Sequence, residues 1–225
     1  MLNKSKGNMY PFVTHTWNTV KGKCPHDCSY CYMKRFGGQP KLHFDEKELK
    51  TDLGTGNFIF VGSSCDMWAE SISQEWIFKT LIHCIKHFEN KYLFQSKNPY
   101  RIYKFRSFIP ENSIVGTTIE SSRYHPQMGT APAIPKRARY MNELAKDGFE
   151  TMVTIEPIMN FGIDALSALV ALCRPKWVNI GADSCSHKLP EPEPEKVLEL
   201  IAELSKFTEV KIKKNLKRII GNETP

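Results

Sequence analysis

Three cysteines, Cys24, Cys28 and Cys31, stand in the spacing CxxxCxxC near the start of the chain. Three thiolates can bind three of the four irons of a 4Fe-4S cluster, each through its own sulfur. The fourth iron then has no protein ligand and is open to a small molecule. This loop is therefore a candidate site of cluster chemistry.

Two other uses of cysteine compete with a cluster. A structural zinc site needs four ligands, commonly in two spaced pairs, and the sequence has no second CxxC pair, although His15 or His26 could complete a tetrahedron. A disulfide scaffold is disfavoured because seven cysteines in 225 residues are an odd number at ordinary density, and no signal peptide is present. This cysteine usage predicts a reducing compartment.

Length and composition predict one domain over residues 1–225, because a chain of this length that is 41% hydrophobic can bury a large core. No apolar stretch approaches the roughly 20 residues that a membrane-spanning helix needs. The N-terminus also lacks the apolar segment of a signal peptide. We therefore expect a cytoplasmic protein with no membrane partner.

The charge balance favours anionic partners, with 31 Lys and Arg against 24 Asp and Glu and a formal net charge of +7. Basic residues gather within residues 97–106, 136–139 and 211–218. Such runs more often form a solvated face than a binding site. Phosphate-bearing substrates are the alternative that this charge leaves open.

Short β-rich runs alternate with amphipathic helical patterns along the chain. The candidate strands, mostly β-branched or aromatic, cover residues 12–17, 57–63, 91–96, 113–119, 151–156, 177–181 and 209–213. Apolar residues at helical spacing predict helices over residues 76–88 and 197–204, and around 141–145. Ser73 should cap the helix over residues 76–88, and Asn98 with Pro99 should start a shorter helix. Gly148 should end the helix around residues 141–145.

Strands that alternate with helices at intervals of roughly 25 to 35 residues predict a parallel sheet built by right-handed crossovers. Six such units form an incomplete barrel, so the expected fold is α/β, a partial (β/α)6 barrel with a mostly parallel sheet. Active residues of parallel barrels lie at the C-terminal ends of the strands. The cysteine loop follows the first predicted strand directly, so the cluster and the other strand ends should share one mouth.

Polar residues follow each apolar strand, and the sequences at these strand ends carry a resemblance. They read Thr16-Trp17-Asn18, Phe60-Val61-Gly62-Ser63-Ser64-Cys65-Asp66, Ser96-Lys97-Asn98-Pro99, Val115-Gly116-Thr117-Thr118-Ile119-Glu120, Ile155-Glu156-Pro157 and Gly181-Ala182-Asp183-Ser184. With the cysteine motif and the aromatic Tyr30 before its last cysteine, the chain resembles the radical S-adenosylmethionine (SAM) superfamily. Within that superfamily it is similar to a phage-associated branch, often described only as a domain of unknown function.

The resemblance implies a mechanism. Cys24, Cys28 and Cys31 would hold a 4Fe-4S cluster, and the methionyl part of SAM would chelate its open iron. Reduction by an electron donor such as flavodoxin or ferredoxin would cleave SAM to a 5′-deoxyadenosyl radical, which abstracts hydrogen from the substrate. The protein would orient SAM, aim the radical and exclude water.

Six residues are expected to bind SAM: Tyr30, Gly62, Ser63, Ser64, Thr118 and Glu120. The small residues of the 62–64 turn would let the backbone approach the SAM amino group closely. The hydroxyl and carboxylate at the end of the fourth strand could bond the ribose hydroxyls or the methionyl part, and Tyr30 would lie near adenine through its backbone. Structural roles stay open as well, since the serines could only turn the chain and Glu120 could pair with Arg123.

Six more residues are candidates for substrate handling: Cys65, Asp66, Lys97, Glu156, Asp183 and Cys185. A thiol that faces the mouth could donate a hydrogen atom or hold a covalent intermediate. Free cysteine more often packs as a small hydrophobe, however, and that reading is open for Cys65 and Cys185. Cys84 and Cys173 lie on apolar helix faces and are expected in the core.

The leading functional hypothesis is a radical SAM enzyme that acts on an anionic small molecule or on a nucleotide or nucleic-acid-like substrate. A second hypothesis is radical modification of a peptide or protein side chain. A third, from another class, is a non-catalytic iron-sulfur binding or electron-transfer protein, which would need no polar strand ends.

Overall fold

An eight-stranded sheet forms the centre of the computed structural model, which describes residues 1–221. The strand order is β1-β2-β5-β6-β7-β8-β9-β10, and only β1 (Asn3–Lys4) is antiparallel to its neighbour. The parallel strands are β2 (His15–Trp17), β5 (Phe58–Val61), β6 (Lys91–Gln95), β7 (Ser113–Thr118), β8 (Glu150–Ile155), β9 (Trp177–Ile180) and β10 (Glu209–Ile212).

The parallel strands follow one another across the sheet in chain order, as in a barrel, and the two edges of the sheet do not pair with each other. This confirms the predicted α/β fold and partial barrel. The parallel part contains the six expected strands and also β10, which confirms the seventh candidate strand at residues 209–213. The predicted single domain also includes residues 222–225, which lie outside the described residues.

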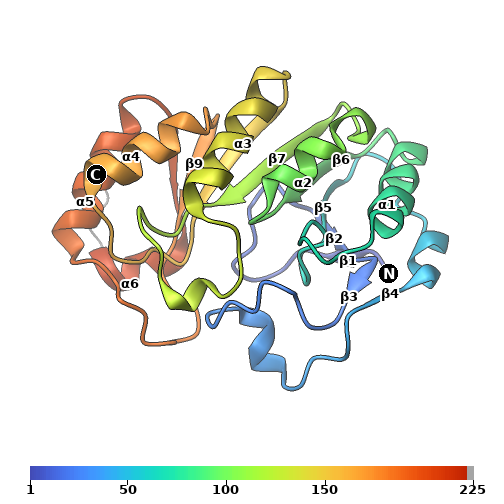
Figure 1. Cartoon of the computed structure of the whole chain (residues 1–225), viewed down its shortest axis with the longest axis horizontal. Coiled ribbons are helices and arrows are strands. Elements are labelled where there is room, and N and C mark those ends of the chain that lie inside the picture. The colour runs from blue at the N-terminus through green and yellow to red at the C-terminus, as the bar shows by residue number, and fades with distance from the viewer. Residues whose placement is uncertain (222–225) are drawn as a thin grey trace.

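Helices cover one face of the sheet (Figure 1). They are α1 (Gln74–Lys86), α2 (Pro99–Lys104), α3 (Ile134–Lys146), α4 (Ile163–Leu172) and α5 (Pro194–Ser205), and the short α6 (Lys217–Ile220) follows β10. The Ser73 hydroxyl accepts a hydrogen bond from the backbone N–H of Glu75 at 3.2 Å, which confirms it as the N-cap of α1. Cys84 and Cys173 are buried in the core between helices and sheet, as expected.

A second, smaller core lies on the other face of the sheet, where Tyr10 and Val13 pack on Leu93, Met152 and Trp177. The ring of Phe12 packs edge-on against Trp177 at 5.3 Å and covers Phe58. These contacts lie toward the N-terminal ends of the strands. Phe12 and Val13 therefore cover this end of the sheet, whereas Tyr10 donates its hydroxyl to Gln95 at 2.8 Å and, with Asn8, lines the cavity at the C-terminal strand ends.

The predicted strands are confirmed within two residues at each end, except that the first begins at His15 rather than at residue 12. A turn closed by the backbone hydrogen bond from Val13 N–H to Tyr10 O, with Pro11 inside it, prevents an earlier start.

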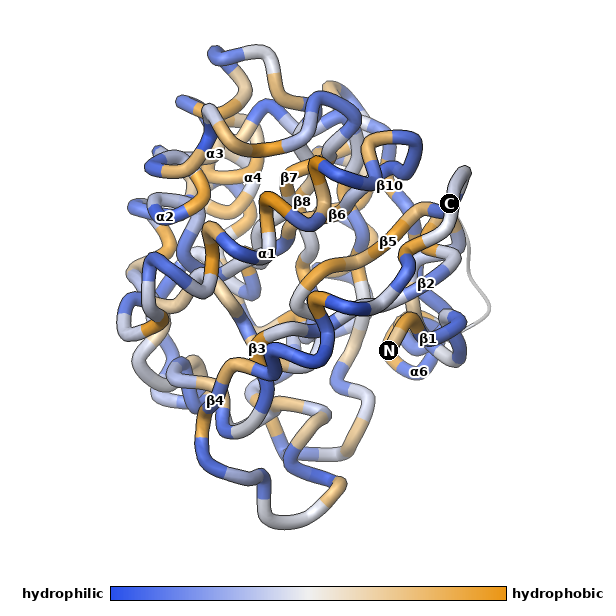
Figure 2. The backbone as a smooth tube through the Cα atoms, turned by 90° about the vertical axis from the view of Figure 1, so that its right-hand side faces the viewer, coloured by the Kyte–Doolittle hydropathy of each residue, from blue (hydrophilic) through white to orange (hydrophobic). Residues whose placement is uncertain are grey.

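Between β2 and β5 the chain leaves the sheet, and a long excursion replaces the usual helix (Figure 2). It carries the cysteine loop, the two-stranded sheet of β3 (Val20–Lys21) with β4 (His43–Phe44), and the 3-10 helices η1 (Tyr32–Phe36) and η2 (Glu46–Lys50). Within residues 1–221, no helix has the length and apolarity to span a bilayer.

Candidate functional site

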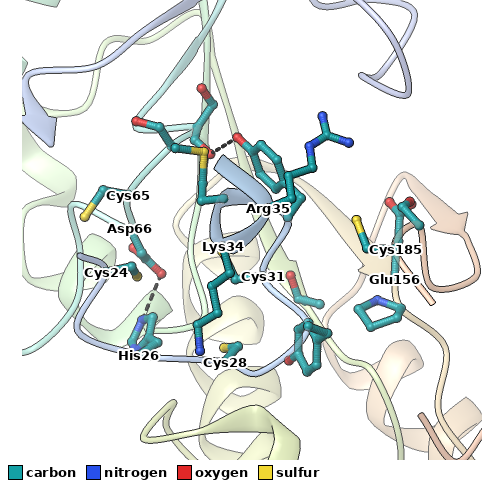
Figure 3. A pocket seen from close by; sticks show the side chains of 18 of the residues that line it. Cys24, His26, Cys28, Cys31, Lys34, Arg35, Cys65, Asp66, Glu156 and Cys185 are labelled. Atoms are coloured by element: carbon teal, nitrogen blue, oxygen red, sulfur yellow. Dashed lines mark hydrogen bonds and ion pairs between the residues drawn. The ribbon is translucent and has the colours of Figure 1, made fainter. Parts of the chain in front are cut away.

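A cavity of about 830 Å³ opens at the C-terminal ends of the parallel strands. The cysteine loop and the 62–66 turn form one wall, and the ends of β8, β9 and β10 form the other (Figure 3). Its volume lies in the range of cavities that enclose small-molecule ligands and cofactors.

The structure brings nearly all of the predicted site residues to this cavity. Those that line it are Cys24, Cys28, Tyr30, Cys31, Gly62, Ser63, Ser64, Cys65, Asp66, Lys97, Thr118, Glu156, Asp183 and Cys185. Glu120 is the exception, because its side chain is fully buried beneath the lining. The expected shared mouth of cysteine loop and strand ends is therefore present.

The loop that follows β7 holds the cysteine loop in place. The backbone N–H of Ser29 donates to Gln127 O at 2.9 Å, and the backbone N–H of Thr130 donates to His26 O at 2.8 Å. The Cys28 thiol donates to Met128 O at 3.3 Å. Because two of these contacts join backbone to backbone, the loop position depends on the path of residues 125–130.

Asp66 joins the cysteine loop to the strand ends. One carboxylate oxygen lies 2.9 Å from His26 Nε2, and the carboxylate also accepts from the Ser96 hydroxyl and from the backbone N–H groups of Lys97 and Trp68. Burial raises the pKa of Asp66, but His26 and the surrounding donors outweigh it and hold this pKa below its usual value. An ionised Asp66 with its oxygens occupied positions the loop.

The thiol of Cys65 lies against Cys24 (Figure 3). The interaction with Cys65 lowers the pKa of Cys24 below the usual value, against the opposing effect of burial. Burial raises the pKa of Cys28 and Cys31. Cys65 thus favours the thiolate form of Cys24, which is the form of cysteine that can bind a metal.

A buried ion network lies directly below the cysteine loop. Glu120 accepts a hydrogen bond from the Tyr30 hydroxyl at 2.5 Å and forms ion pairs with Lys97 at 3.0 Å and Arg137 at 2.7 Å. Burial opposes its ionisation, but Arg137 and Lys97 lower the pKa of Glu120 to about 2. The alternative pairing of Glu120 with Arg123 is wrong, because Arg137 from α3 occupies that place and Arg123 is exposed.

The network has one carboxylate for two cations, so it leaves an excess positive charge in a buried place. Lys97 lies over the Tyr30 ring, 5.3 Å from its centroid. Burial lowers the pKa of Lys97, but Glu120 and the nearby Cys28 raise it above its usual value. A buried excess cation calls for an anion beside it.

The donor set and this charge fit a 4Fe-4S cluster. Three thiolates on such a cluster bind separate irons and carry negative charge, which Lys97 and Arg137 complement. A mononuclear zinc ion instead requires all its sulfur ligands at about 2.3 Å from one point. Among residues 1–221, no group of three or more His, Cys, Asp or Glu side chains is arranged to hold a metal ion, and this includes Cys24, Cys28 and Cys31.

The turn after β5 presents backbone to the cavity. Gly62 has a φ of 81°, a backbone conformation that residues other than glycine rarely adopt. The Asn18 side chain accepts from the backbone N–H of Ser64 at 2.9 Å and from the Ser63 hydroxyl at 3.3 Å. Both serines therefore help to fix the turn.

The opposite wall is built around Glu156. Its carboxylate pairs with Lys213 at 2.6 Å and accepts hydrogen bonds from Asn215 at 2.8 Å and Asn8 at 2.9 Å. A Cβ on Gly181 would meet the Glu156 side chain at 2.8 Å, so glycine is needed for this carboxylate position. Lys213, Asn215 and Asn8 were not predicted from the sequence. The signal for Lys213 was its place directly after the last strand.

Asp183 and Cys185 lie on this wall too. The Asp183 carboxylate accepts from the backbone N–H of Cys185 at 3.1 Å and from the backbone and ring of His187. Burial raises the pKa of Asp183, but His187 and the backbone donors bring it below its usual value. Asp183 thus shapes its own loop, and it sets the partly exposed Cys185 across the cavity from Cys65 (Figure 3).

Comparison with known proteins gives matches in structure alone. No family model and no curated protein sequence matches the chain. Solved structures do match. A double mutant of spore photoproduct lyase with bound AdoMet and dinucleoside spore photoproduct superposes with a TM-score of 0.61 at 12% identity, covering 89% of this chain and 64% of that chain.

The chain shares the fold of spore photoproduct lyase. A single mutant of that lyase with the dinucleoside photoproduct gives a TM-score of 0.60 at 12% identity, with 89% and 63% coverage. Another complex with this dinucleoside gives 0.59 at 11% identity, with 89% and 64% coverage. This chain thus spans a little under two thirds of these relatives' length. The resemblance to a phage-associated branch stays a prediction.

Proposed function

We propose that this chain is a radical SAM enzyme that binds a 4Fe-4S cluster through Cys24, Cys28 and Cys31 and acts on an anionic, nucleotide-like substrate. The observation that carries the proposal is the cavity itself, where these cysteines meet the strand ends above a buried excess of positive charge. The AdoMet and the dinucleoside bound by a protein of the same fold support it.

When bound, the reduced cluster and SAM together would supply the 5′-deoxyadenosyl radical that abstracts a hydrogen atom from the substrate. The residues of this chain position and protect these groups. Asp66 and His26 fix the cysteine loop, and Cys65 favours the thiolate of Cys24. Lys97 supplies positive charge next to the sulfurs of that loop.

SAM is proposed to lie between the cysteine loop and the 62–64 turn. The turn offers backbone groups without bulky side chains, and Thr118 adds a hydroxyl on the cavity lining. Since Glu120 is buried and already bonded to Tyr30, Lys97 and Arg137, we assign it to positioning Tyr30 and Lys97.

The substrate is proposed to occupy the side lined by Glu156, Lys213, Asp183 and Cys185. The Lys213 ammonium lies where it can meet an anionic group, and Glu156 can accept hydrogen bonds from a nucleobase. Cys65 and Cys185 are the two thiols on the lining that can donate a hydrogen atom.

A non-catalytic iron-sulfur protein fits the site less well. Electron transfer alone needs neither a cavity of about 830 Å³ beside the cysteines nor the partly buried Lys213–Glu156 ion pair opposite them. No contact in the described residues favours a peptide or protein side chain as the substrate.

Cluster binding tests this proposal through single cysteines. After anaerobic reconstitution the chain is expected to contain about four irons and four sulfides, and added SAM should change the electron paramagnetic resonance spectrum of the reduced cluster. Cys28→Ser should lose most of this iron. Cys185→Ser, from the same cavity, is the matched control and should retain it. Equal iron loss in both variants, or a wild-type spectrum that SAM leaves unchanged, would count against the proposal.

A further inference from the structure

One edge of the cavity mouth is formed by residues 32–39, which we call the rim segment. It lies between the cysteine loop and β4, in the part of the chain that projects away from the main sheet (Figure 2). Its 3-10 helix η1 buries none of its residues. Tyr32, Lys34 and Arg35 line the mouth, whereas Phe36 is absent from the lining and is 62% exposed.

The rim segment is fixed at both ends. The Tyr32 hydroxyl donates to Ser63 O at 3.0 Å, and the Gln39 side chain donates to Met33 O at 3.0 Å. Where the segment returns, the backbone N–H of Lys23 donates to Pro40 O at 2.9 Å. The exposed aromatic side chain is thus carried on a backbone that is hydrogen-bonded into the site.

Arg35 connects the aromatic rings of this segment. Its guanidinium lies 4.8 Å from the centroid of Phe36 and 5.9 Å from that of Tyr32. Within residues 1–221 no carboxylate lies within ion-pair distance of Arg35, whereas the neighbouring Lys34 is paired with Asp27 at 2.9 Å. An exposed ring beside an unpaired guanidinium is the combination on which proteins stack nucleobases and hold their phosphates.

The size of the cavity determines what must lie outside it. Under the proposed function, this cavity of about 830 Å³ receives both SAM and the reacting nucleotide, and the pocket of one drug-sized ligand already measures roughly 300 to 1,000 Å³. If the reacting nucleotide belongs to a strand, the adjacent nucleotide lies at the mouth, beside the rim segment.

We propose that the rim segment is a docking platform for a nucleic-acid strand, on which the base next to the reacting nucleotide stacks on Phe36 and its phosphate pairs with Arg35. This inference rests on the proposed function and specifies its substrate as a polynucleotide. An acidic redox protein is the competing occupant, and it is disfavoured because charge pairing alone has no use for the exposed ring.

Binding of a fluorescein-labelled thymidine strand of about ten nucleotides tests the platform. Anisotropy is measured anaerobically on the reconstituted protein with SAM. Phe36→Ala is expected to weaken binding by about 5- to 150-fold, as expected for the loss of one stacked base, and Phe36→Trp should restore it. Phe88→Ala, at a ring that is 69% exposed but lies off the cavity lining, is the matched control and should bind as the wild type does.

Arg35→Ala provides a second readout, because loss of one phosphate contact should reduce the slope of log affinity against log salt by about 1. Wild-type affinity in Phe36→Ala, or no strand binding by the wild type, overturns the inference. So does a loss confined to binding of an acidic flavodoxin. Cluster content and SAM cleavage without the strand are measured on the same preparations. If both match the wild type while strand binding does not change as expected, the platform is refuted and the proposed function is retained.

Discussion

Replacing Glu120 with glutamine is expected to lower the free energy of unfolding by about 3 to 5 kcal/mol. The amide keeps the shape of the side chain but removes the charge that faces Lys97 at 3.0 Å and Arg137 at 2.7 Å. Two buried cations are then left without an anion, which is among the most costly single changes in a protein interior. Urea unfolding of the reduced, metal-free chain at pH 7 measures the loss.

The stabilisation by Glu120 should also depend on pH. The pKa of Glu120 is about 2 in the folded chain, below its ordinary value of 4.5. Because the folded-state pKa is the lower one, this carboxylate stabilises the fold fully above pH 4.5 and loses its contribution as the pH falls toward 2. The stability difference between the wild type and Glu120→Gln should therefore be constant near neutral pH and narrow across that acidic interval.

Glu143→Gln is the matched control. Glu143 pairs with Lys146 at 3.0 Å on the surface of α3, so its replacement should change the free energy of unfolding by about 1 kcal/mol or less. Similar losses of unfolding free energy in the two variants, or a Glu120→Gln variant as stable as the wild type, would show that the ion pairs of Glu120 do not stabilise the fold to this extent.

Gly129→Ala is expected to displace the cysteine loop and abolish most cluster binding. Gly129 has a φ of +61°, and an added Cβ would lie 2.1 Å from His26 O and 2.9 Å from the carbonyl of Asp27. Both neighbours belong to the backbone between Cys24 and Cys28, so the clash cannot be relieved by rotating a side chain. Iron and sulfide content after anaerobic reconstitution provides the measurement.

Gly148→Ala is the matched control, because it introduces the strain of a positive φ without a steric clash. Gly148 also has a positive φ, +91°, but an added Cβ there meets nothing within 4 Å. It should cost about 1 kcal/mol of stability and leave the iron content at the wild-type level. Comparable iron loss in both glycine variants would mean that general destabilisation, rather than loop position, controls the site.

The parallel sheet could be predicted because its strands are short apolar runs whose burial depends on local sequence. Residues 91–96 and 113–119 are such runs, and they agree with β6 and β7 to within one residue at each end. The β3–β4 pair and the path of the N-terminal segment could not be found in this way. Their positions follow from contacts with distant parts of the chain, such as Phe12 on Trp177, and not from a local period.

Most of the cavity lining could be predicted from the cysteine motif and from the placement of active residues at the C-terminal ends of parallel strands. Arg137 was missed because its partner lies 17 residues away on another element. A signal for it did exist, since Arg137 stands among Ile134, Ala138 and Met141 on the buried face of α3, where a charge requires a partner. The N-terminal residues of the lining, such as Asn8, carry no motif that could have identified them.

Cleavage of SAM is the most direct test of the central claim. The reconstituted chain is incubated anaerobically with SAM and dithionite, and the products are separated by chromatography. We expect 5′-deoxyadenosine and methionine from the wild type and from Cys185→Ser, and none from Cys28→Ser. Intact SAM in the presence of a fully formed 4Fe-4S cluster would contradict it.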